Sequence, residues 1–204
     1  MMHILGIVGS MRKNSHTNTL VNRVVDDLKA LEPDTKAEII HIVDRDIHPC
    51  RVVCSKYCSN NPYQCSLADD VMEILRKMAQ ADALIIGTPL YFRAPPAQFQ
   101  AWVERMISIF YYHEAQGGGD EASPIKGKLC GLVGVAEYSN PHMMLEYLHD
   151  FCNVLKMKPV GIERFPYLGV AGQGDVNKDT VFHPFEKSRE LAAAIFKEMK
   201  ELKQ

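Results

Sequence analysis

The sequence predicts an α/β protein in which a five-stranded parallel sheet is covered by helices on both faces. Short apolar runs alternate along the chain with longer segments that have a helical period, and this alternation is typical of βαβ units. The most unusual stretches follow the first, third and fourth apolar runs, which would place them at one edge of such a sheet. Doubly wound sheets with strand order 2-1-3-4-5 bind ligands at this edge.

The first half of the chain is expected to supply three strands. Residues 3–8 form an apolar run that ends at Gly9 and Ser10, and residues 37–43 form a second run. Residues 83–87 are continuously apolar, as in a parallel strand that is buried on both faces. Residues 19–31 and 66–80 have apolar side chains at helical spacing, whereas residues 44–66 have no period and predict a long loop.

The second half continues the alternation. Pro95 and Pro96 favour a helix start, and this helix is expected to extend to about residue 112. Residues 113–124 are glycine-rich and predict a surface loop. Residues 129–135 predict the fourth strand, 141–157 a helix, 160–165 the fifth strand, and 180–202 an amphipathic closing helix.

The length and the charge of the chain narrow the possible functions. With 204 residues, of which 47% are hydrophobic, the chain suits one domain over residues 1–204 with a cysteine-rich insertion at residues 45–66. A net charge of −2 gives no basic footprint for nucleic acid. No apolar run reaches the roughly 20 residues of a membrane helix, and the N-terminus lacks the layout of a signal peptide. We therefore expect a cytoplasmic protein without nucleic-acid or membrane partners.

The loop after the first strand predicts an anion site. Backbone N–H groups at the start of a helix attract phosphate, and the hydroxyls of Ser10, Ser15 and Thr17 and the guanidinium of Arg12 can add to them. The loop has neither the P-loop pattern nor the glycine pattern of dinucleotide sites. A hydroxyl-rich loop suits a monoester phosphate such as that of FMN. The alternative is that these side chains only cap the helix.

Three stretches of the chain resemble the NADPH-dependent FMN reductase superfamily of flavodoxin-like proteins. They read L-G-I-V-G-S-M-R-K-N-S-H-T, I-I-G-T-P-L-Y-F and W-V-E-R-M. The stretch that begins with I-H-P-C, contains three further cysteines and ends in D-D-V-M is similar to the iron–sulfur flavoproteins, a branch of that superfamily. The likeness covers residues 5 to about 155. Two features depart from the family, because Met11 stands where proline is frequent and the loop after the fourth strand lacks paired glycines.

The resemblance implies an FMN site at the ligand-binding edge of the sheet. The residues that it implies for the phosphate are Ser10, Arg12, Ser15 and Thr17, with the backbone of His16 nearby. Those that it implies for the flavin ring are Thr88, Pro89, Leu90, Tyr91 and Phe92, with Ala136 and Glu137 on the other side. For Tyr91 and Phe92, packing in a core or an interface is the alternative. No side chain is predicted to be catalytic, because the flavin itself accepts a hydride at N5.

Four closely spaced cysteines predict a metal site. Cys50, Cys54, Cys58 and Cys65 are separated by three, three and six residues. Thiolates that are close in sequence hold iron–sulfur clusters, and the related branch carries a compact motif with slightly shorter gaps. The alternatives to a 4Fe-4S cluster are zinc, redox-active thiols, a disulfide and a site that has lost its metal. Cys130 and Cys152 lie alone in apolar segments and are expected in the core.

The predicted function is that of an FMN-dependent oxidoreductase that passes electrons between FMN and a 4Fe-4S cluster. NAD(P)H is the expected donor, and a small molecule or a ferredoxin-like protein the expected redox partner. The alternatives are a cluster-free NAD(P)H-dependent FMN or quinone reductase and a non-catalytic flavin electron carrier or redox sensor. The stretch from Trp102 through Ile109 to Phe110, Tyr111 and Tyr112 is more apolar than one helix face needs, which predicts a homodimer or homotetramer. A fully buried helix is the alternative.

Overall fold

The computed structural model describes residues 2–51, 55–61, 63–109, 123–178 and 180–202. The strands are β1 (His3–Val8), β2 (Lys36–His41), β3 (Ala83–Pro89), β4 (Leu129–Ala136), β5 (Lys158–Pro159) and β6 (Val170–Gln173). The helices are α1 (His16–Leu31), the 3-10 helix η1 (Ile42–Asp44), α2 (Ser55–Asn60), α3 (Val71–Gln80), α4 (Ala97–Arg105), α6 (His142–Val154) and α7 (Pro184–Glu201). None of these helices is long and apolar enough to cross a membrane.

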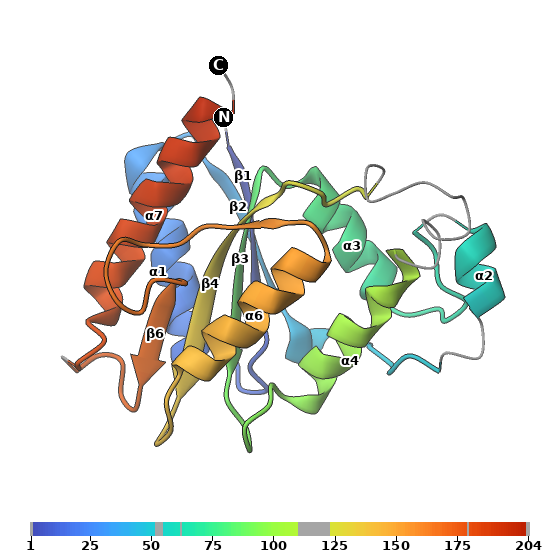
Figure 1. Ribbon diagram of the computed structural model, residues 1–204, viewed down its shortest axis with the longest axis horizontal. Helices are drawn as coiled ribbons and strands as arrows, with labels where there is room; N and C mark the ends of the chain where they lie inside the picture. Colours follow the sequence, from blue (N-terminus) through green and yellow to red (C-terminus); the bar gives the residue numbers. More distant parts are fainter. Residues whose placement is uncertain (1, 52–54, 62, 110–122, 179, 203–204) are drawn as a thin grey trace.

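The strands form one parallel sheet in the order β2-β1-β3-β4-β5, and β6 also pairs with β4 (Figure 1). Helices α1 and α7 cover one face of the sheet, and α3, α4 and α6 cover the other (Figure 1). This arrangement confirms the predicted fold class and strand order. Successive side chains of a strand point to opposite faces, so Leu5 and Ile7 contribute to one hydrophobic cluster while Ile4 and Val8 contribute to the other.

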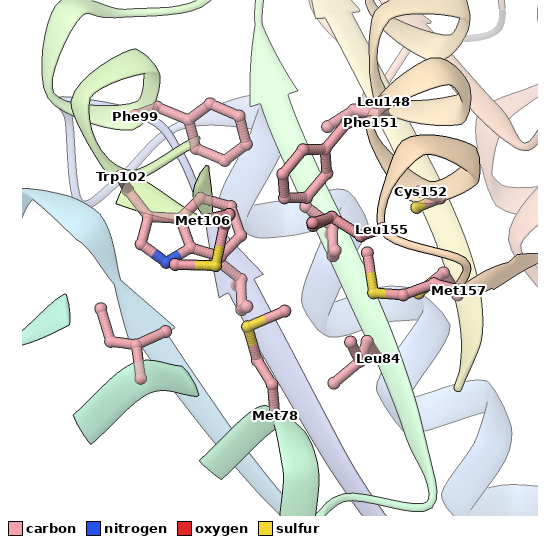
Figure 2. Close-up of a cluster of buried hydrophobic side chains, with 14 of the residues drawn as sticks. Met78, Leu84, Phe99, Trp102, Met106, Leu148, Phe151, Cys152, Leu155 and Met157 are labelled. Carbon is pink, nitrogen blue, oxygen red and sulfur yellow. The ribbon is translucent and has the colours of Figure 1, made fainter. Parts of the chain in front are cut away.

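The core beneath α4 and α6 is rich in aromatic and sulfur-containing side chains (Figure 2). The ring of Trp102 lies 5.2 Å from that of Phe99 and 5.4 Å from that of Phe151, in tilted packing that suits aromatic rings. Cys130 and Cys152 are fully buried, as predicted for core cysteines. Trp102 and Ile109 are buried as well, which supports the buried-helix interpretation for these two residues. Phe110, Tyr111 and Tyr112 lie outside the described residues.

The prediction of a fifth strand at residues 160–165 is wrong. The position beside β4 is occupied by two short strands, β5 next to Leu129 and Cys130, and β6 next to the second half of β4. After Val160 the chain leaves the sheet, because the N–H of Ile162 donates to the carbonyl of Tyr167 (2.7 Å) instead of to β4. The apolar run therefore belongs to a folded excursion between the two strands, which apolar periodicity alone does not distinguish from a strand.

Several helices differ from the prediction at their ends. Helix α1 begins at His16, before the expected start at residue 19, because Ser15 caps it. Helix α3 begins at Val71 and not at residue 66, and the N–H of Val71 donates to Oδ1 of Asp69 (3.2 Å). The long loop expected at residues 44–66 follows η1, with which it shares only Asp44, and contains the short helix α2.

Candidate functional site

The sheet brings the three predicted ligand-binding loops to its carboxyl edge, at the bottom of Figure 1. The N–H of Gly9 donates to the carbonyl of Gly87 (2.7 Å), so the loops after β1 and β3 leave the sheet side by side. The N–H of Leu90 donates to the carbonyl of Val135 (2.7 Å), which places the loop after β4 next to the loop after β3. Residues from three distant parts of the sequence therefore meet at this edge.

Two serines of the first loop already make hydrogen bonds within the protein. Ser15 is the N-cap of α1, and its Oγ accepts the N–H of Asn18 (3.1 Å), so this residue does cap the helix. Ser10 is 1% exposed, and its Oγ accepts the N–H of Arg12 (3.2 Å). A hydroxyl that accepts one hydrogen bond still has a proton to donate. Both serines therefore retain a donor for an anion.

Thr17 differs from the two serines because its hydroxyl makes no hydrogen bond. The residue is 1% exposed, and its Oγ1 is buried without a partner in the described structure. It lies in the first turn of α1, which holds no acidic residue and carries the positive end of the helix dipole. An unsatisfied buried hydroxyl costs about 1–3 kcal/mol, and a bound anion would remove this cost. This orphaned donor therefore fits the phosphate group of FMN.

The remaining residues of the first loop are more open. Arg12 is exposed, and His16, the first residue of α1, is half-buried. Lys13 pairs with Asp44 (2.8 Å), an exposed ion pair that contributes little to stability. Because Arg12 is exposed, its guanidinium is free to contact an anion.

The loop after β3 is a tight turn with an unusual backbone. Thr88 is fully buried, and Pro89 ends the strand. Tyr91 and Ala94 exchange both backbone hydrogen bonds (2.7 and 3.0 Å), and the two residues between them, Phe92 and Arg93, have φ angles of 47° and 66°. Two positive φ angles define a type I′ turn, which usually contains glycine, asparagine or aspartate. Phe92 is fully exposed, which excludes core packing for its ring.

The loop after β4 is joined by a loop that the sequence did not predict. Ala136 is buried at the end of β4, and its carbonyl accepts the N–H of Gly174 (3.0 Å), which follows β6. Glu137 is exposed. The side chain of Gln173 donates to the carbonyl of Ser139 (3.1 Å). Because the predicted fifth strand covers residues 160–165, the sequence does not predict that the loop after β6 meets the loop after β4. The glycines of the stretch G-Q-G-D at residues 172–175 are nevertheless a turn signal.

The β6 loop also approaches the first loop of the site. Hydrogen bonds from the backbone and side chain of Asn177 lower the pKa of Asp175, and the nearby His16 acts in the same direction. Strand β6 also packs closely on α1, because a Cβ added to Gly172 would lie 2.7 Å from Cδ1 of Leu20. The carboxyl edge is therefore formed by four loops, those after β1, β3, β4 and β6.

Within the cysteine segment (residues 50–65), helix α2 lies beyond α3 and α4, away from the carboxyl edge (Figure 1). Cys58 is buried in α2, and Cys50 and Cys65 are half-buried. Cys54 lies outside the described residues. Among the residues that the structure does describe, no three potential ligands are grouped so that they could hold a metal ion. The four cysteines supply the donor type that iron–sulfur clusters use, close together along the chain.

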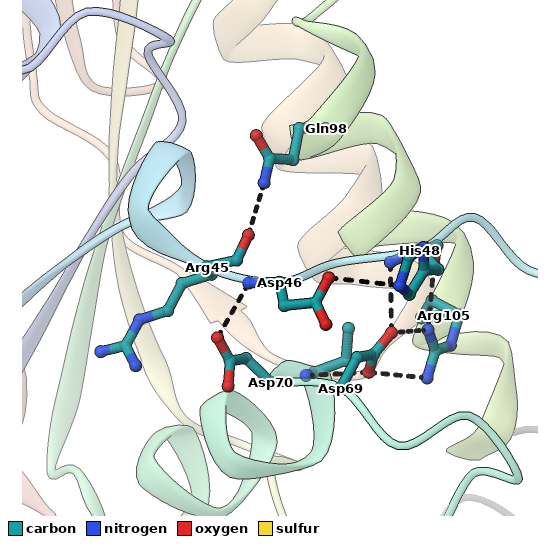
Figure 3. A network of polar contacts seen from close by, with 8 residues as sticks. Arg45, Asp46, His48, Asp69, Asp70, Gln98 and Arg105 are labelled. Atoms are coloured by element: carbon teal, nitrogen blue, oxygen red, sulfur yellow. Dashed lines mark hydrogen bonds and ion pairs between the residues drawn. The ribbon is translucent and has the colours of Figure 1, made fainter.

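A buried ion pair joins Arg105, the last residue of α4, to Asp69, which follows Cys65 by four positions (Figure 3). Burial lowers the pKa of Arg105, but the hydrogen bond with Asp69 and the neighbouring Cys65 outweigh this effect and raise the pKa above its usual value. Burial raises the pKa of Asp69, but hydrogen bonds from Arg105 and from the backbone of His48 and Val71 leave it below its usual value. Both side chains are therefore charged at neutral pH.

A separate groove of about 610 Å³ lies between residues 159–164 and helix α7. Its charged lining residues are Glu163, Arg164, Glu190, Lys197, Glu198 and Glu201. It shares no residue with the predicted flavin site.

Comparison with known proteins identifies relatives of this chain. The sequence profile of the NADPH-dependent FMN reductases matches residues 2–165. An iron–sulfur flavoprotein of Methanocaldococcus jannaschii is 29% identical over 162 residues, which cover 78% of this chain and 76% of that protein. An FMN-dependent NADH:quinone oxidoreductase of Erythrobacter litoralis is 26% identical over 197 residues, which cover 90% of this chain and 96% of that protein.

A solved structure with a similar fold is that of RosB with bound 8-demethyl-8-formylriboflavin-5'-phosphate. It superposes with a TM-score of 0.69 over 100% of this chain and 81% of that one, at 16% sequence identity. At this level of identity the likeness concerns the fold alone.

Proposed function

Because this chain belongs to the NADPH-dependent FMN reductase family, and is therefore a flavin-dependent oxidoreductase, we propose that it binds FMN at the carboxyl edge of its sheet. The proposed phosphate ligands are Ser10, Arg12, Ser15 and Thr17, together with the backbone of His16. The observation that carries this proposal is the buried hydroxyl of Thr17, which has no partner at the start of α1. An anion of fixed position at this helix end would supply the missing acceptor.

We further propose that the flavin ring lies along the loops after β3 and β4. The proposed contacts are Thr88, Pro89, Leu90, Tyr91, Phe92, Ala136 and Glu137. Thr88 and Ala136 are buried and would form the floor of the site, whereas Phe92 and Tyr138 are exposed and would form its rim. When bound, FMN supplies the acceptor for a hydride. The protein holds the ring with backbone groups and buried hydroxyls, and its open rim leaves room for a second molecule.

We propose NADH or NADPH as the electron donor and a quinone or another small organic molecule as an acceptor. The relative from Erythrobacter litoralis, which bears this activity in its name, supports the choice. The exposed aromatic side chains Tyr91, Phe92 and Tyr138 support it as well, because planar rings stack on aromatic surfaces. The same exposed side chains would suit an interface between copies of this chain, and light scattering would measure the expected dimer or tetramer.

The experiment that tests this proposal is a titration of flavin-free protein with FMN, followed by the addition of NADH or NADPH. We expect stoichiometric binding, quenched flavin fluorescence, and bleaching of the bound flavin by at least one of the two donors. Turnover with a quinone distinguishes an enzyme from a passive electron carrier. A protein that binds no FMN would refute the proposal, and one that binds FMN but is reduced by neither donor would support the carrier.

We also propose that Cys50, Cys54, Cys58 and Cys65 hold a 4Fe-4S cluster. The similarity to an iron–sulfur flavoprotein over 78% of the chain supports this assignment, as does the donor set, since four thiolates are the usual ligands of such a cluster. Iron and acid-labile sulfide, measured after anaerobic purification, should each approach four per chain, in keeping with the four thiolate ligands. Bound FMN without iron or sulfide would favour the cluster-free reductase.

A further inference from the structure

The buried ion pair between Arg105 and Asp69 requires an explanation, because it lies outside the proposed flavin site. Its side chains are 1% and 0% exposed, and they meet in a two-pronged contact, with Nη1 to Oδ2 at 2.5 Å and Nη2 to Oδ1 at 3.1 Å. A buried ion pair of this kind adds little net stability compared with an apolar pair of the same size. A role in fixing the positions of neighbouring groups explains the pair better than a role in stability.

The pair joins the two ends of the cysteine segment to α4 (Figure 3). Nη1 of Arg105 also donates to the carbonyl of His48 (2.9 Å), and Oδ2 of Asp69 accepts the N–H of His48 (3.1 Å). His48 precedes Cys50 by two positions, and Asp69 follows Cys65 by four. One guanidinium thus contacts the chain just before the first cysteine and just after the last one.

A second set of contacts reinforces this closure. Asp46 and Asp70 are linked by two hydrogen bonds, from the N–H of Asp46 to Oδ2 of Asp70 (2.9 Å) and from the N–H of Asp70 to the carbonyl of Asp46 (2.9 Å). Gln98 of α4 donates to the carbonyl of Arg45 (2.6 Å). The base of the segment is therefore held at several points, while the cysteines lie in the part of the chain that it encloses.

Arg105 also faces the segment itself. The neighbouring Cys65 helps to raise the pKa of the Arg105 guanidinium, and its Nε is buried without a hydrogen-bond partner in the described structure. A guanidinium has five N–H donors in a rigid fork, so this one has a donor to spare after it binds Asp69 and His48. Thiolate sulfur is an acceptor of suitable charge.

We propose that the Arg105–Asp69 pair is a clamp that closes the base of the cysteine segment and positions Cys65 and Cys50 for metal binding. The part that concerns metal rests on the proposed iron–sulfur function. Arg105 is thus a positioning residue and not a ligand. The proposal requires that a change at Arg105 alter the cysteine segment while the flavin site, which lies at a different edge, keeps its FMN.

The test compares Arg105→Lys with Arg164→Lys in the full-length, FMN-loaded protein. Lysine keeps the charge but loses the planar fork. Arg164 is a control, because it too pairs with carboxylates, those of Glu186 and Glu190, but does so on the surface. The readouts are iron per FMN, the electron paramagnetic resonance spectrum of the reduced protein, and the rate of alkylation of Cys65 after the removal of metal.

We expect Arg105→Lys to keep its FMN, lose most of its iron and show an altered spectrum. Cys65 should alkylate about tenfold faster, because the segment opens more often once one charge-assisted hydrogen bond at its base is lost. Arg164→Lys should match the wild type in every readout. Wild-type iron content and wild-type alkylation in Arg105→Lys would overturn the proposal.

Two further experiments decide the proposal if Arg105→Lys does not fold or if the wild type binds no iron. If Arg105→Lys does not fold, the double variant Asp69→Leu with Arg105→Met replaces the pair by apolar side chains, and it should fold but remain poor in iron. Full iron occupancy in this double variant would refute the clamp. If the wild type itself binds no iron, the cluster proposal fails, and the alkylation rates alone decide the clamp, which unchanged rates would refute.

Discussion

Replacing Thr17 by valine separates a phosphate ligand from a residue that only packs. Valine keeps the β-branched shape of threonine and removes the hydroxyl. The residue is 1% exposed and its hydroxyl has no partner in the described structure, so the substitution breaks no hydrogen bond of the flavin-free protein. The substitution should therefore leave stability unchanged or raise it, while it weakens FMN binding.

The magnitudes follow from the burial of the hydroxyl. An unsatisfied buried polar group costs about 1–3 kcal/mol, so the free energy of unfolding of the flavin-free protein should be unchanged or rise by up to this amount. A hydrogen bond to a charged phosphate is worth about 1.5–3 kcal/mol. Its loss should weaken FMN binding by roughly 10- to 150-fold.

Thr19→Val is the matched control for this experiment. The hydroxyl of Thr19 already donates to the carbonyl of Ser15 (3.3 Å), within the same helix. This control should lower stability slightly and leave FMN affinity near that of the wild type. Urea unfolding of the flavin-free proteins and fluorescence titration with FMN measure the two quantities. If Thr17→Val destabilises the protein but binds FMN as tightly as the wild type, the assignment of the phosphate site is wrong.

Three other predictions concern the neighbourhood of the site and the core. In Gly87→Ala the new Cβ would lie 2.5 Å from Cγ2 of Val21 and 3.2 Å from Cβ of Val133, so urea unfolding should show a loss of about 1–3 kcal/mol through overpacking; unchanged stability would show that α1 moves freely. Arg93→Gly should relieve about 1 kcal/mol at a φ angle of 66° and raise Tm by about 2–4 °C in a calorimeter, whereas a lower Tm would mean that the arginine side chain stabilises the turn. Burial, assisted by Glu104, raises the pKa of Tyr147 to about 12. Because the unfolded chain ionises near pH 10, the contribution of Tyr147 to stability is complete below that pH and is lost as the pH rises through about 12. Absorbance titration should lose one late-ionising tyrosine in Tyr147→Phe, and an unchanged curve would contradict the assignment.

The sequence was sufficient for the parts of the fold that have strong periodicity. β1, β3 and β4 are continuous apolar runs, and the structure has them within two residues of the expected ends. The convergence of the loops after these strands followed from topology alone, because parallel strands end at one edge. The capping role of Ser15 and the burial of Cys130 and Cys152 were also among the interpretations drawn from the residues.

Other features depend on contacts that no local pattern reveals. The apolar run at residues 160–165 has the composition of a strand, but the hydrogen bond between Ile162 and Tyr167 directs it away from β4. The ion pair of Arg105 with Asp69 joins residues 36 positions apart, and nothing in the sequence around either residue marks the other as its partner. The turn at Phe92 and Arg93 was not predicted, because bulky residues are rare at positive φ.

Two short strands, β5 and β6, share the edge position of the sheet beside β4. We expect this edge to tolerate insertions and deletions in the chain between them. Neither strand is long enough to present a continuous ladder to another chain, which limits edge-to-edge aggregation. Because β6 pairs with β4 independently of β5, the polypeptide between them could grow or shrink while Gln173 and Gly174 stay at the carboxyl edge. This stretch is a natural place for related proteins to acquire new surface elements, and for an engineer to insert a peptide, while the cofactor edge is preserved.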